Sequence, residues 1–222
     1  MKPGLTRLLP LAALLCCGWL DSAAAASIVY SDGDFSTWTS STIFGTAGGQ
    51  TVVRQAAGGN GGAFLSVTTV TGDTTFTGLF APSFVYNPSA GAITSIVASI
   101  DYRNIYSIGQ GQAVALTLAQ NGSYFRAGPF ITGSSTNTWQ TNGPTTFVLG
   151  NFVRLAGTGT LDFSAGGAPI AVGFSTGNSG GYGINVGYDN FNVTLNTVPV
   201  PAAAWLMVSA LGALGAARVR GA

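Results

Sequence analysis

The sequence is poor in charged side chains, and between residues 27 and 197 it has no His, Glu, Lys or Cys. Charged residues make up 7% of its 222 residues, whereas an average soluble domain has about 25%. A nucleic-acid partner requires a basic patch that releases counterions, and the net charge of +1 argues against one. Hydroxyl and amide side chains therefore have to keep the surface hydrated.

The absence of imidazole and thiol groups limits the chemistry of this central region. Both cysteines, Cys16 and Cys17, lie in an N-terminal apolar run. Serine and cysteine triads, thiol nucleophiles and the usual zinc ligands are thus excluded. The remaining catalytic route is a pair of Asp carboxylates about 5–10 Å apart in a cleft, as in glycosidases. No such pairing is visible in the sequence, and we expect a protein that is not an enzyme.

Residues 1–26 have the pattern of a secretory signal peptide. Lys2 and Arg7 form a positive n-region, and Leu8 to Leu20 form an apolar h-region. A small-residue cleavage site follows, formed by Ala24, Ala26 and Ser27. The sequence therefore predicts export, with the Sec translocase and signal peptidase as partners.

The other end of the chain, residues 198–222, combines two prolines, an apolar stretch and a basic terminus. Residues 202–217 would span roughly 24 Å as a helix, against about 30 Å for a bilayer core. Arg218 and Arg220 would remain in the cytoplasm by the positive-inside rule. Pro199 and Pro201 enforce an extended approach to this segment. We expect residues 202–217 to form a transmembrane helix that holds the chain at the inner membrane.

This order of Pro pair, apolar helix and terminal Arg residues resembles the PEP-CTERM sorting signal of Gram-negative bacteria. The Pro-Glu-Pro motif of that family stands here as Pro-Val-Pro. The residues that carry the resemblance are Val198, Pro199, Val200, Pro201, Ala202, Ala203, Trp205, Arg218 and Arg220. The resemblance implies processing by an exosortase, an inner-membrane intermediate, and final release to the cell surface or extracellular matrix. It also implies association with exopolysaccharide in biofilm formation. The alternative is a tail that is retained, which would give a membrane-tethered surface protein.

Residues 27–197 show the alternating pattern of half-buried β-strands. In residues 170–175 and 191–195, for example, apolar side chains alternate with small or polar ones. Glycine-rich clusters separate the apolar runs, and no segment has a helical period of useful length. About nine to eleven short strands predict an all-β, two-sheet sandwich of jelly-roll type. The domain plan is a signal helix (1–26), a β-sandwich (27–197) and a sorting and transmembrane segment (198–222).

Two short motifs in this region resemble bacterial jelly-roll modules of the carbohydrate-binding type. The first is SDGDFSTWT at residues 31–39, and the second is GYDNFNVTL at residues 187–195. In that fold the first and last strands pair, which would bring the motifs together. Related jelly rolls also place a structural calcium ion there, and Asp32, Asp34 and Asp189 are the candidate ligands. The alternative is a polar turn at Asp32–Asp34; we expect no other cofactor.

A sugar-binding face is the function that such a sandwich suggests, with exposed aromatic rings stacking on pyranose rings. Tyr182, in a glycine-rich loop, and Trp139 are the candidate residues, and core packing is the alternative for both. Asp101 and Arg103 share one strand face and are expected to form a surface ion pair or to contact a ligand. The sequence thus predicts an exported, non-enzymatic surface or matrix protein, with a calcium-stabilised carbohydrate-binding module as the alternative.

Overall fold

The computed structural model describes residues 25–45, 49–70, 74–107, 112–128, 130–131, 137–178 and 183–198. The predicted signal peptide up to residue 24, Tyr182, and the predicted sorting and transmembrane segment from Pro199 onward lie outside the described residues. Within the described ranges, no helix is both long and apolar enough to span a lipid bilayer.

The regular structure of the described ranges consists of thirteen β-strands and two short 3₁₀ helices. The strands are β1 (Ala26–Asp32), β2 (Thr39–Phe44), β3 (Gln50–Gln55), β4 (Phe64–Thr69), β5 (Thr75–Tyr86), β6 (Ala92–Ser107), β7 (Ala113–Gln120), β8 (Ser123–Ala127), β9 (Phe130–Ile131), β10 (Gln140–Phe147), β11 (Phe152–Ala156), β12 (Ile170–Asn178) and β13 (Ile184–Val198). The helices are η2 (Pro88–Ala90) and η3 (Leu149–Asn151).

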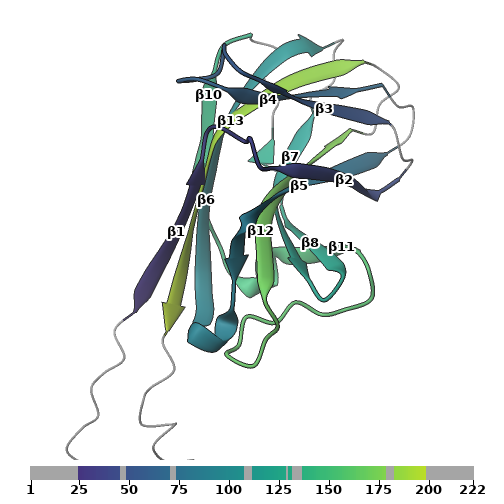
Figure 1. Cartoon of the computed structure of the whole chain (residues 1–222). Helices are drawn as coiled ribbons and strands as arrows, with labels where there is room; N and C mark the ends of the chain where they lie inside the picture. The colour runs from purple at the N-terminus through teal and green to yellow at the C-terminus, as the bar shows by residue number, and fades with distance from the viewer. Residues whose placement is uncertain are drawn as a thin grey trace, which may run out of the picture.

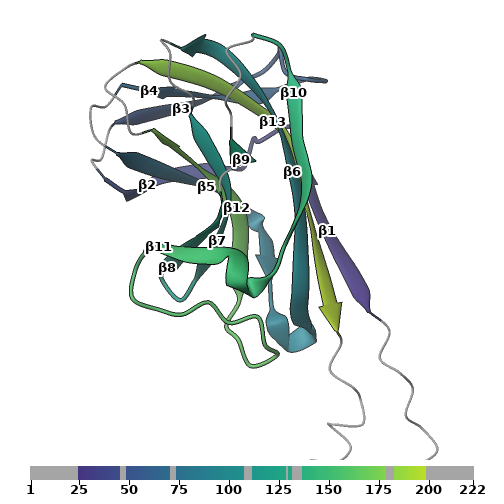
Figure 2. The ribbon, with the colours of Figure 1, turned by 180° about the vertical axis from the view of Figure 1, so that it is seen from behind.

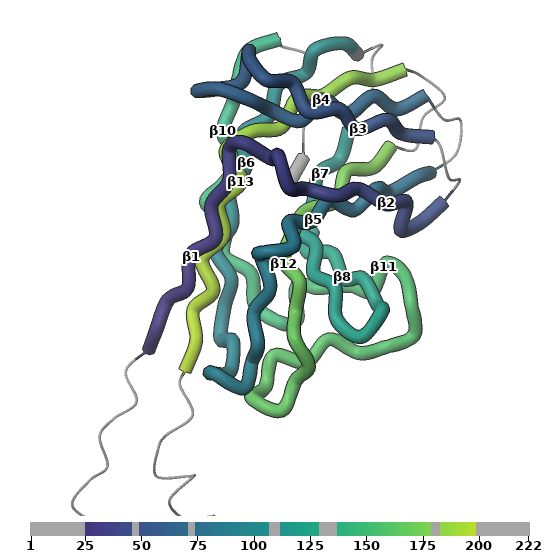
Figure 3. The backbone as a smooth tube through the Cα atoms, viewed as in Figure 1, coloured from purple at the N-terminus to yellow at the C-terminus, as the bar shows by residue number. Residues whose placement is uncertain are grey.

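The strands form two antiparallel sheets that pack face to face (Figures 1 and 2). Sheet A has the order β10–β6–β13–β4–β3, and β1 also pairs with β13. Sheet B has the order β11–β8–β7–β12–β5–β2, and β9 also pairs with β7. The first half of β13 pairs with β4 and its second half with β1, a path that can be followed in Figure 3. The long strands β6 and β13 therefore run through the whole of sheet A.

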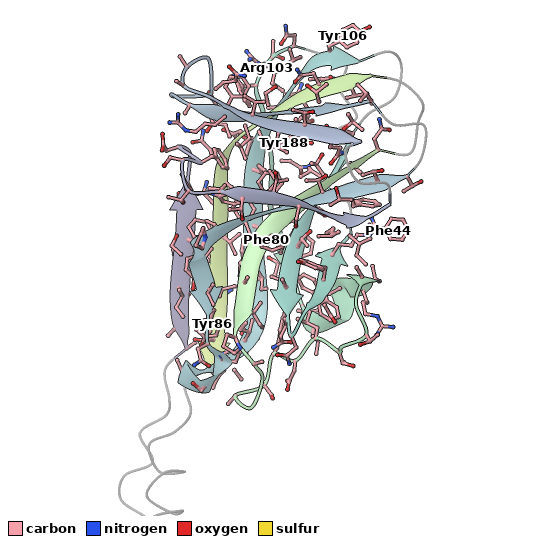
Figure 4. All side chains as sticks on the ribbon, turned by 45° about the vertical axis from the view of Figure 1, so that its right-hand side comes forward. Phe44, Phe80, Tyr86, Arg103, Tyr106 and Tyr188 are labelled. Carbon is pink, nitrogen blue, oxygen red and sulfur yellow. The ribbon has the colours of Figure 1, made fainter. Side chains whose placement is uncertain are left out.

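The core lies between the sheets and is built from alternate residues of the central strands. The inward side chains of β7 and β13 are all almost completely buried: Val114, Leu116, Leu118, Ile184, Val186, Tyr188, Phe191, Val193 and Leu195. Figure 4 shows Tyr188 between the two layers. Its hydroxyl shares a 2.9 Å hydrogen bond with the hydroxyl of Thr176. Burial raises the pKa of Tyr188, so the phenol stays neutral in the core.

The structure confirms the predicted all-β, two-sheet sandwich. It also confirms that the first and last strands pair, because β1 lies along β13 with Asp32 opposite Phe191 and Ala26 opposite Thr197. The two sequence motifs, 31–39 and 187–195, are therefore adjacent in space. The ends of β1 and β13 lie side by side at one end of the sandwich (Figure 1).

The described residues contain more strands than the nine to eleven predicted. Strand β2 and the first half of β5 were not predicted: the first four residues of β2 are polar, and the hydrophobic pattern of β5 is reversed there. On β5, Thr75 and Thr77 are buried between the sheets, whereas Phe76 and Phe80 lie on the outer face and are half-buried. Packing in the core does not explain why large aromatic residues lie on the outer face of this sheet.

Candidate functional site

The outer face of sheet B carries a group of large side chains that we call the aromatic strip. Its members are Phe44 from β2, Phe76 and Phe80 from β5, and Tyr124 and Arg126 from β8. Figure 4 places Phe80 over the strands of this face and Phe44 at its far edge. Phe44 is 47% exposed, and the other four are half-buried. The two edge strands of sheet B, β2 and β11, approach each other to within 8 Å between Cα atoms, so this sheet is strongly curved.

Two bridges of side chains cross the middle of the strip. The ring centroids of Phe80 and Tyr124 are 6.0 Å apart. The guanidinium carbon of Arg126 lies 5.1 Å from the centroid of the Phe76 ring, which is a cation–π contact. In both cases one side chain comes from β5 and the other from β8, with β12 and β7 between them. The side chains therefore reach toward each other across two intervening strands.

Glycines on β12 allow the Phe76 and Phe80 rings to pack closely against the sheet. A Cβ atom at Gly177 would lie 2.3 Å from two carbon atoms of the Phe76 ring. A Cβ atom at Gly173 would lie 2.7 Å from the Phe80 ring. Real Cβ atoms do not approach other atoms so closely, so any larger residue would push the rings away from the backbone. The glycines thus leave room for the two rings directly over β12.

The strip also covers two hydroxyl groups of the sheet. Thr117 on β7 donates a 2.7 Å hydrogen bond to Ser175 on β12, and neither residue is exposed, although both lie on the outer face. A layer of rings over satisfied hydroxyls is well packed and does not need a partner to be stable. What it presents to solvent is a row of aromatic surfaces beside a cation. Such a surface suits a ligand with flat apolar faces and polar edges.

The sequence-predicted residue Trp139 lies elsewhere, on the outer face of sheet A. Its ring packs edge-to-face against Phe64 at 5.5 Å, and its indole N–H donates to the carbonyl of Gly58 at 3.2 Å. The guanidinium carbon of Arg103 lies 4.9 Å from the Trp139 ring and 5.3 Å from the Phe64 ring. Trp139 is thus half-buried in local packing that holds the β3–β4 loop, residues 56–63.

The three carboxylates predicted to bind calcium are not gathered into one site. Within the described ranges, no group of three or more His, Cys, Asp or Glu side chains is placed to hold a metal ion. Asp32 accepts hydrogen bonds from the backbone N–H groups of Asp34 and Phe35 and from the indole of Trp38. Asp34 forms an ion pair with Arg54. The alternative interpretation, a polar turn, describes Asp32–Asp34 better.

Asp189 instead pairs with Asp101, which lies directly opposite it on β6. The two residues are 2% and 5% exposed. Asn60 of the β3–β4 loop donates from its backbone to Asp189 at 2.6 Å and from its side chain to Asp101 at 2.7 Å. Asn190 and Thr141 donate to Asp101 as well. Burial, and then the charge of Asp101, raises the pKa of Asp189, while hydrogen bonds from Asn190 and Asn60 lower it.

This carboxylate pair bears on two predictions from the sequence. The enzyme alternative required two Asp side chains in a cleft, but the loop covers this pair and its hydrogen bonds occupy the carboxylate oxygens. Asp101 and Arg103 do not form the expected ion pair; among the described residues, Arg54 and Asp34 form the ion pair that the structure contains. The pair therefore fastens a loop.

Three residues of the predicted processing sites lie in described strands. The side chain of Ser27 donates to Asn196 at 2.9 Å, and the carbonyl of Ala26 accepts from Thr197 at 3.2 Å. Val198 ends β13 and is 44% exposed. The remaining residues of the predicted cleavage site and sorting motif lie outside the described residues, and those assignments stay predictions.

The sequence analysis did not find the aromatic strip. The one signal in the sequence is the run TFTGLF at residues 75–80, in which Phe alternates with Thr and Gly rather than with charged residues. The glycines that accept the rings lie about a hundred residues later, on β12, and only the strand register connects them: Gly177 is opposite Phe76, and Gly173 is opposite Phe80.

The sequence matches no family model, and no curated protein matches it significantly. Among solved structures, the chain is similar to a family 11 carbohydrate-binding module from Clostridium thermocellum in complex with a tetrasaccharide. That match has 15% identity, covers 74% of this chain and 94% of that chain, and has a TM-score of 0.47. A xylan-binding domain from Paenibacillus barcinonensis matches with 15% identity, covering 80% and 99%, at a TM-score of 0.39. An exo-beta-agarase matches with 16% identity, covering 73% of this chain and 24% of that chain, at 0.44. At such identities and TM-scores, no residue role transfers to this chain.

Proposed function

We propose that the protein is a non-catalytic polysaccharide-binding protein that holds a glycan chain on the aromatic strip. Sugars present C–H faces that stack on aromatic rings, and a row of rings lets successive sugar units bind the same surface. The close packing of the Phe76 and Phe80 rings over Gly177 and Gly173 is the observation that carries this proposal. Gly173 also allows the close approach of the Leu79 carbonyl, and both glycines leave room for a ring on the outer face.

The test is binding to insoluble and soluble polysaccharides by the purified protein and by a variant with Phe80→Ala and Tyr124→Ala. These two rings form the bridge that is made of aromatic side chains alone, whereas the other bridge, between Phe76 and Arg126, contains a charged group. Each stacking contact is worth about 1 kcal/mol, so the double variant is expected to bind at least about tenfold more weakly. Affinity electrophoresis in gels that contain each polysaccharide measures this loss directly.

The matched control is Tyr106→Ala. Tyr106 is 56% exposed and lies on the outer face of sheet A, as Figure 4 shows, so its loss removes a more accessible ring from the face that the proposal does not use. Circular dichroism melting verifies that each variant is folded. Equal binding by wild type and the double variant, or equal losses in the double variant and in Tyr106→Ala, would reject the strip as the site. Insensitivity to a calcium chelator is expected throughout.

For the location of the protein, the supporting observations are the signal-peptide pattern and the resemblance of the tail to a PEP-CTERM signal. We propose export by Sec, sorting by an exosortase, and residence at the cell surface or in an exopolysaccharide matrix. Because Ala26 and Thr197 are adjacent, the start of β1 and the end of β13 lie at the same end of the sandwich, and this end would face the membrane during processing. The start of β6 would lie at this end as well, because Ala92 is opposite Val198.

The intact mass of the protein recovered from outside its native host tests this location. A chain from about Ser27 to near Pro199 or Pro201 is expected, with any additional mass assigned to a transferred anchor or to glycosylation. A mass that includes residues 202–222 would contradict exosortase processing and favour the membrane-tethered alternative.

A further inference from the structure

The arginines of the described residues divide into two kinds. Arg54 pairs with Asp34, and Arg154 donates to the carbonyls of Thr158 and Gly159. Arg103 and Arg126 instead stack on aromatic rings, and within the described part of the chain neither forms an ion pair. The two stacked guanidinium groups lie on opposite faces of the sandwich, Arg103 on sheet A and Arg126 on sheet B.

Among the described residues, no carboxylate pairs with either stacked arginine. The five described aspartates all accept hydrogen bonds from other groups of the chain: Asp32, Asp34, Asp101, Asp162 and Asp189. Each negative charge of the described residues is therefore engaged within the fold, whereas two positive charges are not. Since a guanidinium is always ionised and presents a planar fork of donors, it attracts carboxylates and sulfates.

Arg126 is placed at the binding surface proposed above. It stacks over Phe76 at 5.1 Å, and two residues earlier on the same strand Tyr124 stacks with Phe80. Alternate residues of a strand lie about 7 Å apart on one face. A sugar stacked on the Phe80–Tyr124 bridge would thus have the guanidinium beside it, within reach of a charged substituent.

We infer that the strip takes an anionic polysaccharide, one that bears carboxylate or sulfate groups, and that Arg126 binds the anionic group. This inference rests on the proposed function of the strip and names its ligand class. The Phe76 ring lies against the half-buried Arg126 guanidinium and displaces water from that side, which strengthens the attraction for an anion. The solvent-accessible part of the guanidinium remains for the ligand.

Four polymers test the ligand class: polygalacturonate, its carboxyl-reduced derivative, dextran sulfate and dextran. The wild-type protein is expected to bind polygalacturonate or dextran sulfate at least about tenfold more tightly than the matching neutral polymer, since only the anionic polymer can form a charge-assisted hydrogen bond with Arg126. Whichever of the two anionic polymers binds more tightly identifies the anionic group. Raising the salt concentration is expected to reduce the preference.

Arg126→Gln and Arg103→Gln form a matched pair of variants. Each removes one unpaired, ring-stacked guanidinium and changes the net charge equally, but only Arg126 belongs to the strip. Arg126→Gln is expected to lose the preference for the anionic polymer, a drop of about tenfold, while Arg103→Gln keeps it. Arg126→Lys, which retains the charge without the planar fork, is expected to fall between them.

The outcomes separate this inference from the proposed function. If wild type binds neutral and anionic polymers equally, the inference fails while the strip remains a glycan site. If Arg103→Gln and Arg126→Gln weaken binding equally, net charge and not Arg126 governs the affinity, which also overturns the inference. If none of a broad set of polysaccharides binds, the proposed function itself fails.

Discussion

Replacing Trp38 with alanine is expected to lower the free energy of unfolding by about 4 kcal/mol. Trp38 lies where the chain passes from β1 in sheet A to β2 in sheet B. Its ring contacts four aromatic rings, those of Phe35, Phe84, Phe174 and Phe191, with centroid distances from 5.1 to 5.5 Å. These four rings come from the crossing loop and from both sheets. Loss of their contacts with Trp38 would therefore weaken the packing between the two sheets.

The alanine variant also removes a hydrogen-bond donor. The indole N–H of Trp38 donates to Asp32 at 2.9 Å, and the same carboxylate accepts from the N–H groups of Asp34 and Phe35. Asp32 thereby fixes the turn in which Phe35 takes a positive φ of 56° and points into the core. A carboxylate that loses one of three donors holds this turn less firmly.

Urea unfolding followed by circular dichroism measures the change, with Trp38→Phe as the control. Phenylalanine keeps most of the ring contacts and loses only the N–H donor, so a smaller loss of about 1–2 kcal/mol is expected. Small domains are stable by only about 5–15 kcal/mol, and the alanine variant is therefore expected to be marginal at 37 °C. A decrease in the free energy of unfolding of less than about 1 kcal/mol for Trp38→Ala would show that packing between the sheets does not depend on this ring.

The motif at residues 31–39 illustrates what the sequence can predict. The resemblance to jelly-roll modules correctly placed this motif beside residues 187–195, because strand pairing of the first and last strands is a property of the fold. The same resemblance also predicted a calcium site, because Asp32 and Asp34 are close together and carboxylates are ligands that calcium prefers. In the structure, backbone N–H groups, Trp38 and Arg54 engage these carboxylates instead.

The candidate site was beyond sequence analysis for a physical reason. Whether Phe76 faces the core or solvent depends on one residue of register, and the register follows from which strands become neighbours. The pairing of Phe76 with Gly177 joins residues that the sequence separates by about a hundred positions. The same holds for Asp101 and Asp189, which are opposite each other on β6 and β13. The sequence indicated Asp101 and Arg103 as a pair because they are close along one strand.

Replacing Asp189 with alanine is expected to destabilise the fold by about 3 kcal/mol and to release the β3–β4 loop. Asp189 accepts hydrogen bonds from the backbone N–H groups of Asn60 and Asn190, and each buried donor left without an acceptor costs about 1–3 kcal/mol. The loop packs so closely on this carboxylate that a Cβ atom at Gly59 would lie 2.5 Å from it. Hydrogen exchange of residues 56–63 is expected to accelerate in this variant. The control is Asp101→Asn, whose amide can donate to Thr141 and still accept from Asn60 and Asn190.

The pH dependence of the free energy of unfolding tests the contribution of Asp189 further. Because the pKa of Asp189 is raised in the folded state by burial and then by the charge of Asp101, its ionised form is disfavoured there. Its contribution to stability is therefore greatest below the ordinary Asp pKa of about 3.9 and declines as pH rises through the raised value. The stability difference between wild type and Asp189→Ala should accordingly grow between pH 7 and pH 4. The opposite contribution of Asp34, whose pKa is lowered by hydrogen bonds from Ser36 and Arg54, is present in both proteins and cancels.

The control variant Asp101→Asn removes the repulsion between the two carboxylates. The stability of this variant is therefore expected to depend less steeply on pH over this range than that of wild type. A difference between wild type and Asp189→Ala that shrinks on acidification would mean that the loop is fastened chiefly by the ionised carboxylate.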